Sequence, residues 1–181
     1  MNLFYCFGGL VFTTFLFQFV TGALLTIFYR PSVLGPSLPA GWFLRGCHRL
    51  SSNYCLSLML VHAARVFFAG GHYRPRELPW ASGLLLATLA SAFGVTGYTL
   101  PWDQLGFWAF AIVTALPGAL DSYAPGAGAA LVLLLRGGPA LGQLSLSRCF
   151  SAHTFFLPAA LLSVLLAHFI AIRKQGISGP L

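Results

Sequence analysis

Four long stretches of this 181-residue chain are apolar enough to cross a lipid bilayer, and this feature constrains its fold more than any other. A transmembrane helix needs about 20 consecutive apolar residues, and the four stretches cover about residues 4–29, 41–70, 78–102 and 149–172. Only 7% of the residues are charged, which is too few to cover the surface of a soluble globule. The sequence therefore predicts an all-α, integral membrane four-helix bundle that forms one domain over residues 1–181, and it excludes a soluble enzyme.

The apolar segment between the third and fourth stretches, residues 104–147, is interrupted by prolines and glycines. Each uninterrupted piece is too short to cross the hydrocarbon comfortably, so we expect short surface helices between spans three and four. Four spans place both termini on the same side of the membrane. If Arg45 and Arg49 serve a purpose inside the second span, the remaining basic residues favour the cytoplasmic-type side for the termini. The basic residues are scattered singly, so no nucleic-acid partner is expected.

Four of the five histidines lie inside two of the expected spans. His48 and His62 are 14 residues apart in the second span, and His153 and His168 are 15 apart in the fourth, so each pair lies within about 60° on one helix face. Because these two spans run in the same direction, we expect His48 to face His153 and His62 to face His168. Two facing imidazoles fill both axial positions of a haem iron, which favours electron transfer over oxygen or substrate binding. The pairs would lie about 21 Å apart, which places one haem in each leaflet.

Other roles are open for each histidine taken alone. A histidine inside a span is often only a hydrogen-bond partner between packed helices, although four in register argue against this alternative. A metal-ion site without haem is disfavoured, because no Asp, Glu or Cys lies within a turn of each histidine on the same face, apart from Cys47, which points elsewhere.

Small and basic residues accompany the four histidines. Two glycine pairs repeat at the same 14-residue spacing, Gly8 with Gly22 in the first span and Gly83 with Gly97 in the third. Such glycines would allow the flanking helices to approach two haem faces, and ordinary packing of membrane helices is the alternative. Three arginines near the histidines are suited either to anionic haem propionates or to reaching the membrane interface: Arg45, Arg49 and Arg148.

Four sequence motifs resemble the b6 type of the cytochrome b family, a four-helix haem-binding protein. They are NLFYCFGG at residues 2–9, RGCHRL at 45–50, FGVTGYTLPWDQLGFWA at 93–109 and HFIAIRKQGISGPL at 168–181. The resemblance covers nearly the whole chain. The 15-residue histidine spacing in the fourth span also matches the b6 type, whereas mitochondrial-type members use 14.

The resemblance implies a transmembrane electron-transfer subunit of a plastoquinol–plastocyanin reductase, in which electrons from lumenal quinol oxidation cross the membrane and proton translocation is coupled to this transfer. By this resemblance His48 and His153 ligate the lumenal haem b, and His62 and His168 ligate the stromal one. Cys6 would form a single thioether bond to a third, c-type haem; without the resemblance it would be a packing thiol. Arg173 would pair with a haem propionate on the stromal side.

The resemblance further implies a quinol pocket at the lumenal end of the third span. Its expected wall consists of Pro101, Trp102, Asp103, Gln104, Phe107 and Trp108. Asp103 would assist proton exit there, or it is simply a helix stop at the interface. The family's catalytic glutamate belongs to a separate subunit, so this chain is expected to be part of an enzyme and not complete alone.

The resemblance also implies a set of partners and a location. The expected partners are a second cytochrome b-type subunit, a Rieske iron–sulfur protein, cytochrome f and small subunits in a dimeric complex, with plastoquinone, chlorophyll a and beta-carotene. The expected location is the thylakoid membrane, with both termini on the stromal side. The alternatives are a b6-type subunit of a menaquinol–cytochrome c reductase, a small bis-histidine dihaem reductase, and a transporter or structural bundle without haem.

Overall fold

A computed structural model describes residues 6–34 and 41–179. The few expected span residues before Cys6, and residues 35–40, 180 and 181 of the expected domain, lie outside the described residues. Within this part of the chain the fold is helical and contains no strand. Its elements are α1 (Phe7–Phe28), α2 (Trp42–Phe68), α3 (Glu77–Thr99), α4 (Gln104–Ala115), η2 (Leu116–Ser122), α5 (Ala127–Arg136), α6 (Gln143–Ser151), η3 (Ala152–Phe156) and α7 (Leu157–Gln175).

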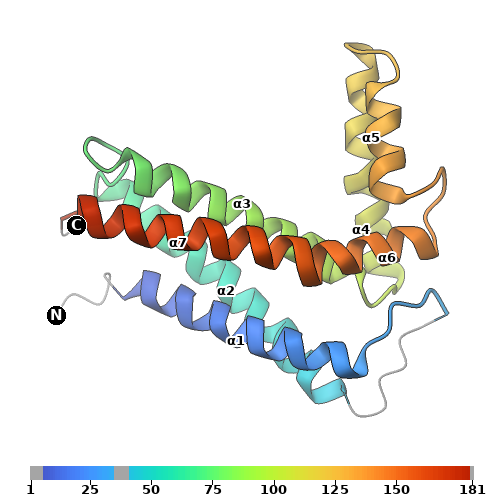
Figure 1. Cartoon of the computed structure of the whole chain (residues 1–181), viewed down its shortest axis with the longest axis horizontal. Coiled ribbons are helices and arrows are strands. Elements are labelled where there is room, and N and C mark those ends of the chain that lie inside the picture. The colour runs from blue at the N-terminus through green and yellow to red at the C-terminus, as the bar shows by residue number, and fades with distance from the viewer. Residues whose placement is uncertain (1–5, 35–40, 180–181) are drawn as a thin grey trace.

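Four long helical segments lie side by side and form the bundle (Figure 1). α1 packs along α2, and α3 packs along α7, while α2 and α3 touch each other at fewer places. α1 begins and α7 ends at the same end of the bundle, as an even number of crossings requires (Figure 1). Each of the four apolar ranges expected from the sequence overlaps one of these helices, so the all-helical, four-helix membrane architecture is confirmed. α3 begins one residue before its expected range, and the last helix, Gln143–Gln175, extends beyond its expected range at both ends.

The last long helix is continuous from Gln143 to Gln175, although its hydrogen bonding changes on the way. Between α6 and α7, the turn Ala152–Phe156 has the wider π-helical geometry. A π-helical turn bonds residue i to residue i+5, so it inserts one extra residue without ending the helix. This widened turn holds His153, one of the four histidines expected to be functional.

The segment between α3 and α6 forms a helical hairpin that stands across the direction of the bundle (Figure 1). α4 and η2 form one arm and α5 the other. α5 begins after Gly126 and ends before Gly137, with φ of 84° and 80°, values that favour glycine. Asp121 holds the two arms together, because its Oδ1 accepts the backbone N–H of Gly128 at 2.7 Å. A crosswise hairpin is the arrangement expected for surface helices.

Length and composition alone would select a different set of spans. Among the described residues, the helices long and apolar enough to cross a membrane are α1, α3, the arm Gln104–Ser122 and the helix Gln143–Gln175. α2 is not in this set, and it is the helix that carries His48, His62 and three arginines. Polar side chains inside a membrane are costly unless they have partners or bind a ligand, so the histidines and arginines of α2 indicate that this helix carries the functional site.

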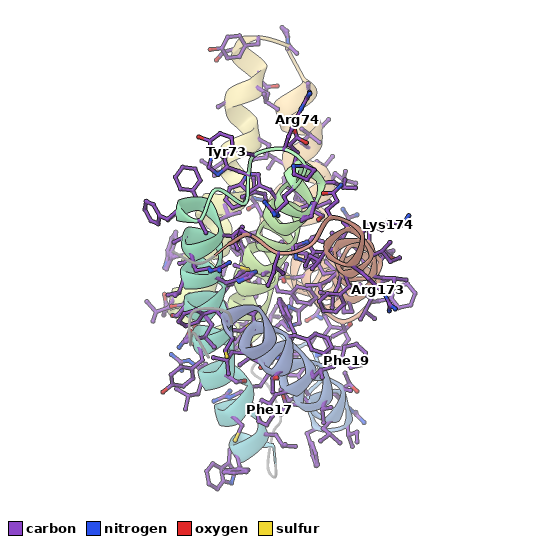
Figure 2. All side chains as sticks on the ribbon, turned by 90° about the vertical axis from the view of Figure 1, so that its left-hand side faces the viewer. Phe17, Phe19, Tyr73, Arg74, Arg173 and Lys174 are labelled. Carbon is purple, nitrogen blue, oxygen red and sulfur yellow. The ribbon has the colours of Figure 1, made fainter. Side chains whose placement is uncertain are left out.

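Few side chains of the bundle are buried by other parts of the chain. The core cluster consists of Val11, Met59 and Ala90, from α1, α2 and α3, with four partly buried apolar residues around it. Large apolar side chains elsewhere are exposed, for example Phe19 at 54% and Leu166 at 63%. Figure 2 looks along the bundle and shows Phe17 and Phe19 on the outside of α1. Such a surface requires lipid, partner subunits or cofactors to cover it.

Candidate haem-binding site

The four histidines of the two expected spans meet in two pairs. His48 lies near the start of α2, and its ring faces His153 of the π-helical turn with ring centres 6.3 Å apart and ring planes at 77°. His62 lies about three-quarters of the way along α2, close enough to His168 of α7 for an electrostatic interaction. The early histidines thus meet one another, and so do the late ones, at two levels of the same bundle. We call these the His48–His153 tier and the His62–His168 tier.

The widened turn explains how spacings of 14 and 15 residues fit together. On two regular α-helices, the extra residue between His153 and His168 would rotate one imidazole by about 100° away from its partner. Because the turn Ala152–Phe156 is π-helical, it absorbs the extra residue on the side of His153. Both histidines of the fourth span can then face α2.

The four glycines expected beside the haem groups lie against the histidine rings. A Cβ atom added to each glycine would meet the Cε1 atom of one imidazole. The distances are 3.1 Å for Gly8 and His62, 3.2 Å for Gly22 and His48, 3.3 Å for Gly83 and His168, and 2.7 Å for Gly97 and His153. Each glycine thus gives room to one ring of the neighbouring helix, so the shared 14-residue spacing of glycines and histidines has a direct steric cause.

Three hydroxyl groups that were not predicted from the sequence contact these histidines. The hydroxyl oxygen of Thr21 lies 2.8 Å from Nδ1 of His48. The hydroxyl oxygen of Ser82 lies 2.8 Å from Nδ1 of His168, and that of Thr96 lies 2.9 Å from Nδ1 of His153. The signal was present in the sequence, because each hydroxyl residue comes directly before one of the spaced glycines. At the fourth position Phe7 precedes Gly8.

The arrangement fits a haem iron between the two imidazoles. With a metal–nitrogen distance of about 2 Å on each side, the two ring centres must lie about 6 Å apart. The ring centres of His48 and His153 lie 6.3 Å apart. In the described residues, the backbones of α2 and α7 are not among the closely packed helix pairs, and side chains such as those of His48 and His153 lie between these helices. No group of three or more His, Cys, Asp or Glu side chains suited to a bare metal ion occurs in residues 6–34 and 41–179.

The expected propionate-binding arginines have different surroundings. Arg45 and Arg49 are exposed in the first two turns of α2, on either side of His48. Arg148 is also exposed, and its Nη1 donates to the backbone carbonyl of Leu134 at the end of α5. Arg173 is exposed in the last turn of α7 beside Lys174, at the end of the bundle nearest the His62–His168 tier (Figure 2).

Arg65 was not among the expected site residues, but it is buried one turn after His62. Its two terminal nitrogens donate to Ser178 Oγ at 2.8 Å and to the carbonyl of Gly179 at 3.1 Å. It therefore fastens the segment after α7 onto α2. A basic residue on the histidine-bearing helix was visible in the sequence, but its partner lies more than 100 residues away in the chain.

The four cysteines differ in exposure. Cys6 is exposed at the start of α1, two residues before the glycine that contacts His62. Cys55 and Cys149 are buried, and the Sγ of Cys149 donates to the carbonyl of Thr96 at 3.3 Å. Cys47 is partly buried beside His48. The exposed thiol thus lies at the His62–His168 end, whereas two of the others are packed inside the bundle.

Five of the six residues expected to form a quinol pocket line one open cavity of about 290 Å³: Trp102, Asp103, Gln104, Phe107 and Trp108. Pro101 is not part of this lining, although it lies next to it in the chain. Asp103 is the N-cap of α4, and its Oδ1 accepts the backbone N–H of Gly106 at 2.8 Å. Trp102 has a φ of 53°, a left-handed conformation that is uncommon for a large side chain. This turn therefore presents an indole ring and a capping carboxylate at the cavity.

The chain is similar to known proteins along nearly its whole length. The family described as cytochrome b/b6/petB matches residues 1–176. Cytochrome b6 of Heterocapsa triquetra is 52% identical over 190 residues, which cover all of this chain and 87% of that protein. Cytochrome b6 of Chlamydomonas reinhardtii is 47% identical over 190 residues, with 100% and 86% covered.

A solved structure titled "Hyperthermophilic respiratory Complex III" contains a similar chain, with a TM-score of 0.89 and 30% identity. The match covers 99% of this chain and 50% of that one, so the chain spans about half the length of this structural relative.

The four-helix membrane bundle, together with these relatives, defines a membrane protein of the electron-transfer class. The chain belongs to the cytochrome b/b6 family. With its b6 relatives, it is an electron-transfer subunit of a b6f-type quinol oxidoreductase and a multi-pass protein of the thylakoid membrane. Haem b is the cofactor that this family implies, and membership of a multi-subunit complex follows from the same relatives.

Proposed function

We propose that His48 with His153, and His62 with His168, hold two haem b groups in one transmembrane domain. The observation that carries this proposal is the 6.3 Å separation of the His48 and His153 rings, together with the glycine that makes room for each of the four imidazoles. When bound, the two haem groups supply one-electron transfer between the two ends of the bundle. An imidazole on each side of an iron leaves no position for oxygen, so the histidines restrict the site to electron transfer.

Basic side chains at both ends of the bundle support the same arrangement. Arg45, Arg49 and Arg148 lie near the His48–His153 tier, and Arg173 lies beyond His168. Guanidinium groups bind carboxylates through charged hydrogen bonds. Arg148 already donates one N–H to Leu134, so we propose that its remaining donors face a propionate.

We propose that the cavity beside Trp102 and Phe107 receives quinol, with Pro101 next to it in the chain. Aromatic rings would hold a flat quinol ring by stacking, and the amide of Gln104 is a polar group within the same lining. Quinol oxidation also needs a proton acceptor. Asp103 is the one acidic residue of the lining, and it already caps α4, so the principal base must come from another subunit.

We also propose that Cys6 binds a c-type haem covalently through one thioether bond. Its thiol is exposed and lies at the end of α1 near the His62–His168 tier, whereas Cys55 and Cys149 are buried. A third haem beside this tier would accept electrons that have crossed the bundle. Arg173 lies at the same end and is available for its propionates (Figure 2).

The proposed complex transfers electrons from plastoquinol to plastocyanin and couples this transfer to proton translocation. The proposed partners are a second cytochrome b-type subunit, a Rieske iron–sulfur protein, cytochrome f and small subunits in a dimer, with chlorophyll a and beta-carotene bound. Both termini are proposed to lie on one side of the membrane, because α1 begins and α7 ends at the same end of the bundle (Figure 1), and the resemblance to the b6 type makes this the stromal side. Enzyme activity belongs to the complex and not to the isolated chain.

The first experiment is to purify the native complex, record its reduced-minus-oxidised spectrum, and stain a denaturing gel for haem peroxidase activity. We expect two extractable b haems and one haem that stays on the chain and disappears in Cys6→Ala. Cys47→Ala, a change in a partly buried thiol, should keep all three haems. Absence of b haems in the wild-type complex would overturn the proposal, and two haems with none retained would overturn only the role of Cys6.

A second candidate is the b6-type subunit of a menaquinol–cytochrome c reductase. The fold similarity to a chain from a respiratory Complex III favours it as the alternative. Extraction and identification of the quinone from the purified complex separates the two: plastoquinone supports the first candidate and menaquinone the second.

A further inference from the structure

Three of the four histidines share one kind of partner, a serine or threonine hydroxyl on the neighbouring helix. Thr21 of α1 contacts His48, whereas Ser82 and Thr96 of α3 contact His168 and His153, all at Nδ1 and at 2.8–2.9 Å. Each of these hydroxyl residues is followed by the glycine that makes room for the same imidazole.

The direction of these hydrogen bonds follows from the other bond of each hydroxyl. Thr21, Ser82 and Thr96 donate their hydroxyl protons to backbone carbonyls four residues earlier in their own helices, at 2.8, 2.8 and 2.7 Å. A hydroxyl has only one proton to donate, so its oxygen can only accept from the imidazole. The histidine must therefore carry its proton on Nδ1.

A neutral imidazole with its proton on Nδ1 has a free electron pair on Nε2. Nε2 is then the atom available to bind iron. A metal-bound histidine whose other nitrogen donates a hydrogen bond is fixed in orientation and is a stronger electron donor. A stronger donor stabilises the oxidised iron and lowers its reduction potential.

We propose that Thr21, Ser82 and Thr96 are positioning residues that fix the histidine tautomers and lower the reduction potentials of the haems. This inference rests on the proposed function, because it needs haem at both tiers. The hydroxyl and the following glycine act together: the hydroxyl accepts from Nδ1, while the glycine leaves room at Cε1, the next atom of the ring. The hydroxyl and the glycine thus contact one edge of the imidazole ring at two neighbouring atoms, Nδ1 and Cε1.

The two tiers differ in this respect. Both histidines of the His48–His153 tier donate to a hydroxyl, whereas in the His62–His168 tier the glycine beside His62 follows Phe7, whose side chain has no hydroxyl. Among the described residues, Ser82 is the hydroxyl residue that contacts a histidine of the second tier. A substitution of Thr96 therefore affects the His48–His153 tier, and a substitution of Ser82 affects the His62–His168 tier, although both residues lie in α3.

The test uses the assembled, haem-loaded complex with Thr96→Val and Ser82→Ala. The matched controls are Thr88→Val and Ser91→Ala, because both hydroxyls lie in α3, donate to a carbonyl four residues earlier and are exposed. The readouts are haem content, the midpoint potential of each b haem by redox titration, and the low-spin EPR spectrum.

We expect normal haem content and a raised midpoint potential for one haem in each variant. Thr96→Val should affect the haem of the His48–His153 tier, and Ser82→Ala that of the His62–His168 tier, with an EPR change in the same haem. Thr96→Ser should restore the wild-type potential, and both controls should leave both potentials unchanged.

Unchanged potentials and EPR spectra in Thr96→Val and Ser82→Ala would overturn the inference and reduce these hydroxyls to packing groups. If Thr96→Val does not assemble, Thr96→Ser decides: a wild-type potential supports the inference, and an altered potential with normal haem content overturns it. Absence of b haem from the wild-type complex would instead reject the proposed function itself.

Discussion

A Cβ atom on Gly97 would lie 2.7 Å from Cε1 of His153, closer than real Cβ contacts allow. The glycine lies within α3 and has ordinary helical geometry, so backbone freedom does not explain it. The missing side chain is what matters, because the imidazole of the widened turn fills that volume. The histidine ring at this tier therefore cannot keep its place if the neighbouring helix gains a single methyl group.

Gly97→Ala should remove the haem of the His48–His153 tier and keep the other. The methyl group must push the ring aside, and overpacking of this kind costs about 1–3 kcal/mol in addition to misplacing the ligand nitrogen. The pyridine haemochrome assay should show a loss of one of the two b haems. Gly94→Ala is the control in the same helix, because its added Cβ would make an ordinary 3.5 Å contact with Leu56. Equal haem content in both variants would contradict the prediction.

Gly8→Ala should affect the opposite tier. The added methyl group would lie 3.1 Å from Cε1 of His62, so the ring must give way by a few tenths of an ångström and the potential of that haem should shift. The neighbouring substitution Gly9→Ala meets nothing within 4 Å and should behave like wild type. Redox titration of the two b haems tests this pair, and a larger change in Gly9→Ala would refute the steric explanation.

Deletion of Phe155 from the widened turn should leave both haems bound. Phe155 is exposed, and its removal would let the turn become a regular α-helix, with 14 residues between the two histidines as in α2. Haem content and the reduced-minus-oxidised spectrum report the result.

The opposite change is the control for this deletion. One alanine inserted after Phe156 adds a second extra residue, which the turn cannot absorb, so one histidine should rotate away and one haem should be lost. A deletion that loses haem while the insertion keeps it would show that the π-helical turn does not serve to align the histidines.

Asp103→Asn should preserve quinol oxidation by the complex, and Asp103→Ala should slow it. Asparagine can cap α4 as aspartate does, whereas alanine loses the hydrogen bond to Gly106 and about 1 kcal/mol of helix stability next to the cavity. Steady-state quinol oxidation as a function of pH is the measurement. If Asp103→Asn slows the reaction as much as Asp103→Ala and shifts the pH profile, the carboxylate carries protons and is more than a cap.

The histidine pairing could be predicted from the sequence because the rise along a helix axis and the rotation around it are both proportional to the number of residues. The spacing of His48 and His62 predicts their common face, and the equal spacing of the glycines predicts their level in the bundle. What the glycines contact was less visible. The spacing predicted that they lie beside haem faces, and the structure adds that each of them lies against an imidazole ring.

Other parts of the site depend on information that residue spacing does not carry. The 15-residue spacing of His153 and His168 shows that one extra residue must be accommodated, but neither this spacing nor any residue type in Ala152–Phe156 predicts that a π-helical turn at His153 accommodates it. The hydroxyl partners lie on different helices from their histidines, so only the tertiary structure brings Thr96 to His153. Arg65 and Ser178 likewise meet only after the whole bundle has formed.

The small core of the bundle has a consequence for how the protein is made. Only Val11, Met59 and Ala90 form a buried cluster between the two tiers, and α2 does not pack closely on α7 in the described part of the chain. We therefore expect cofactor loading and completion of the interior to be coupled, since a haem bound by the paired histidines would bring the facing surfaces of α2 and α7 into one buried interior. We expect a cell short of haem to accumulate two loosely joined helix pairs, α1 with α2 and α3 with α7, which membrane proteases would degrade faster than the loaded protein.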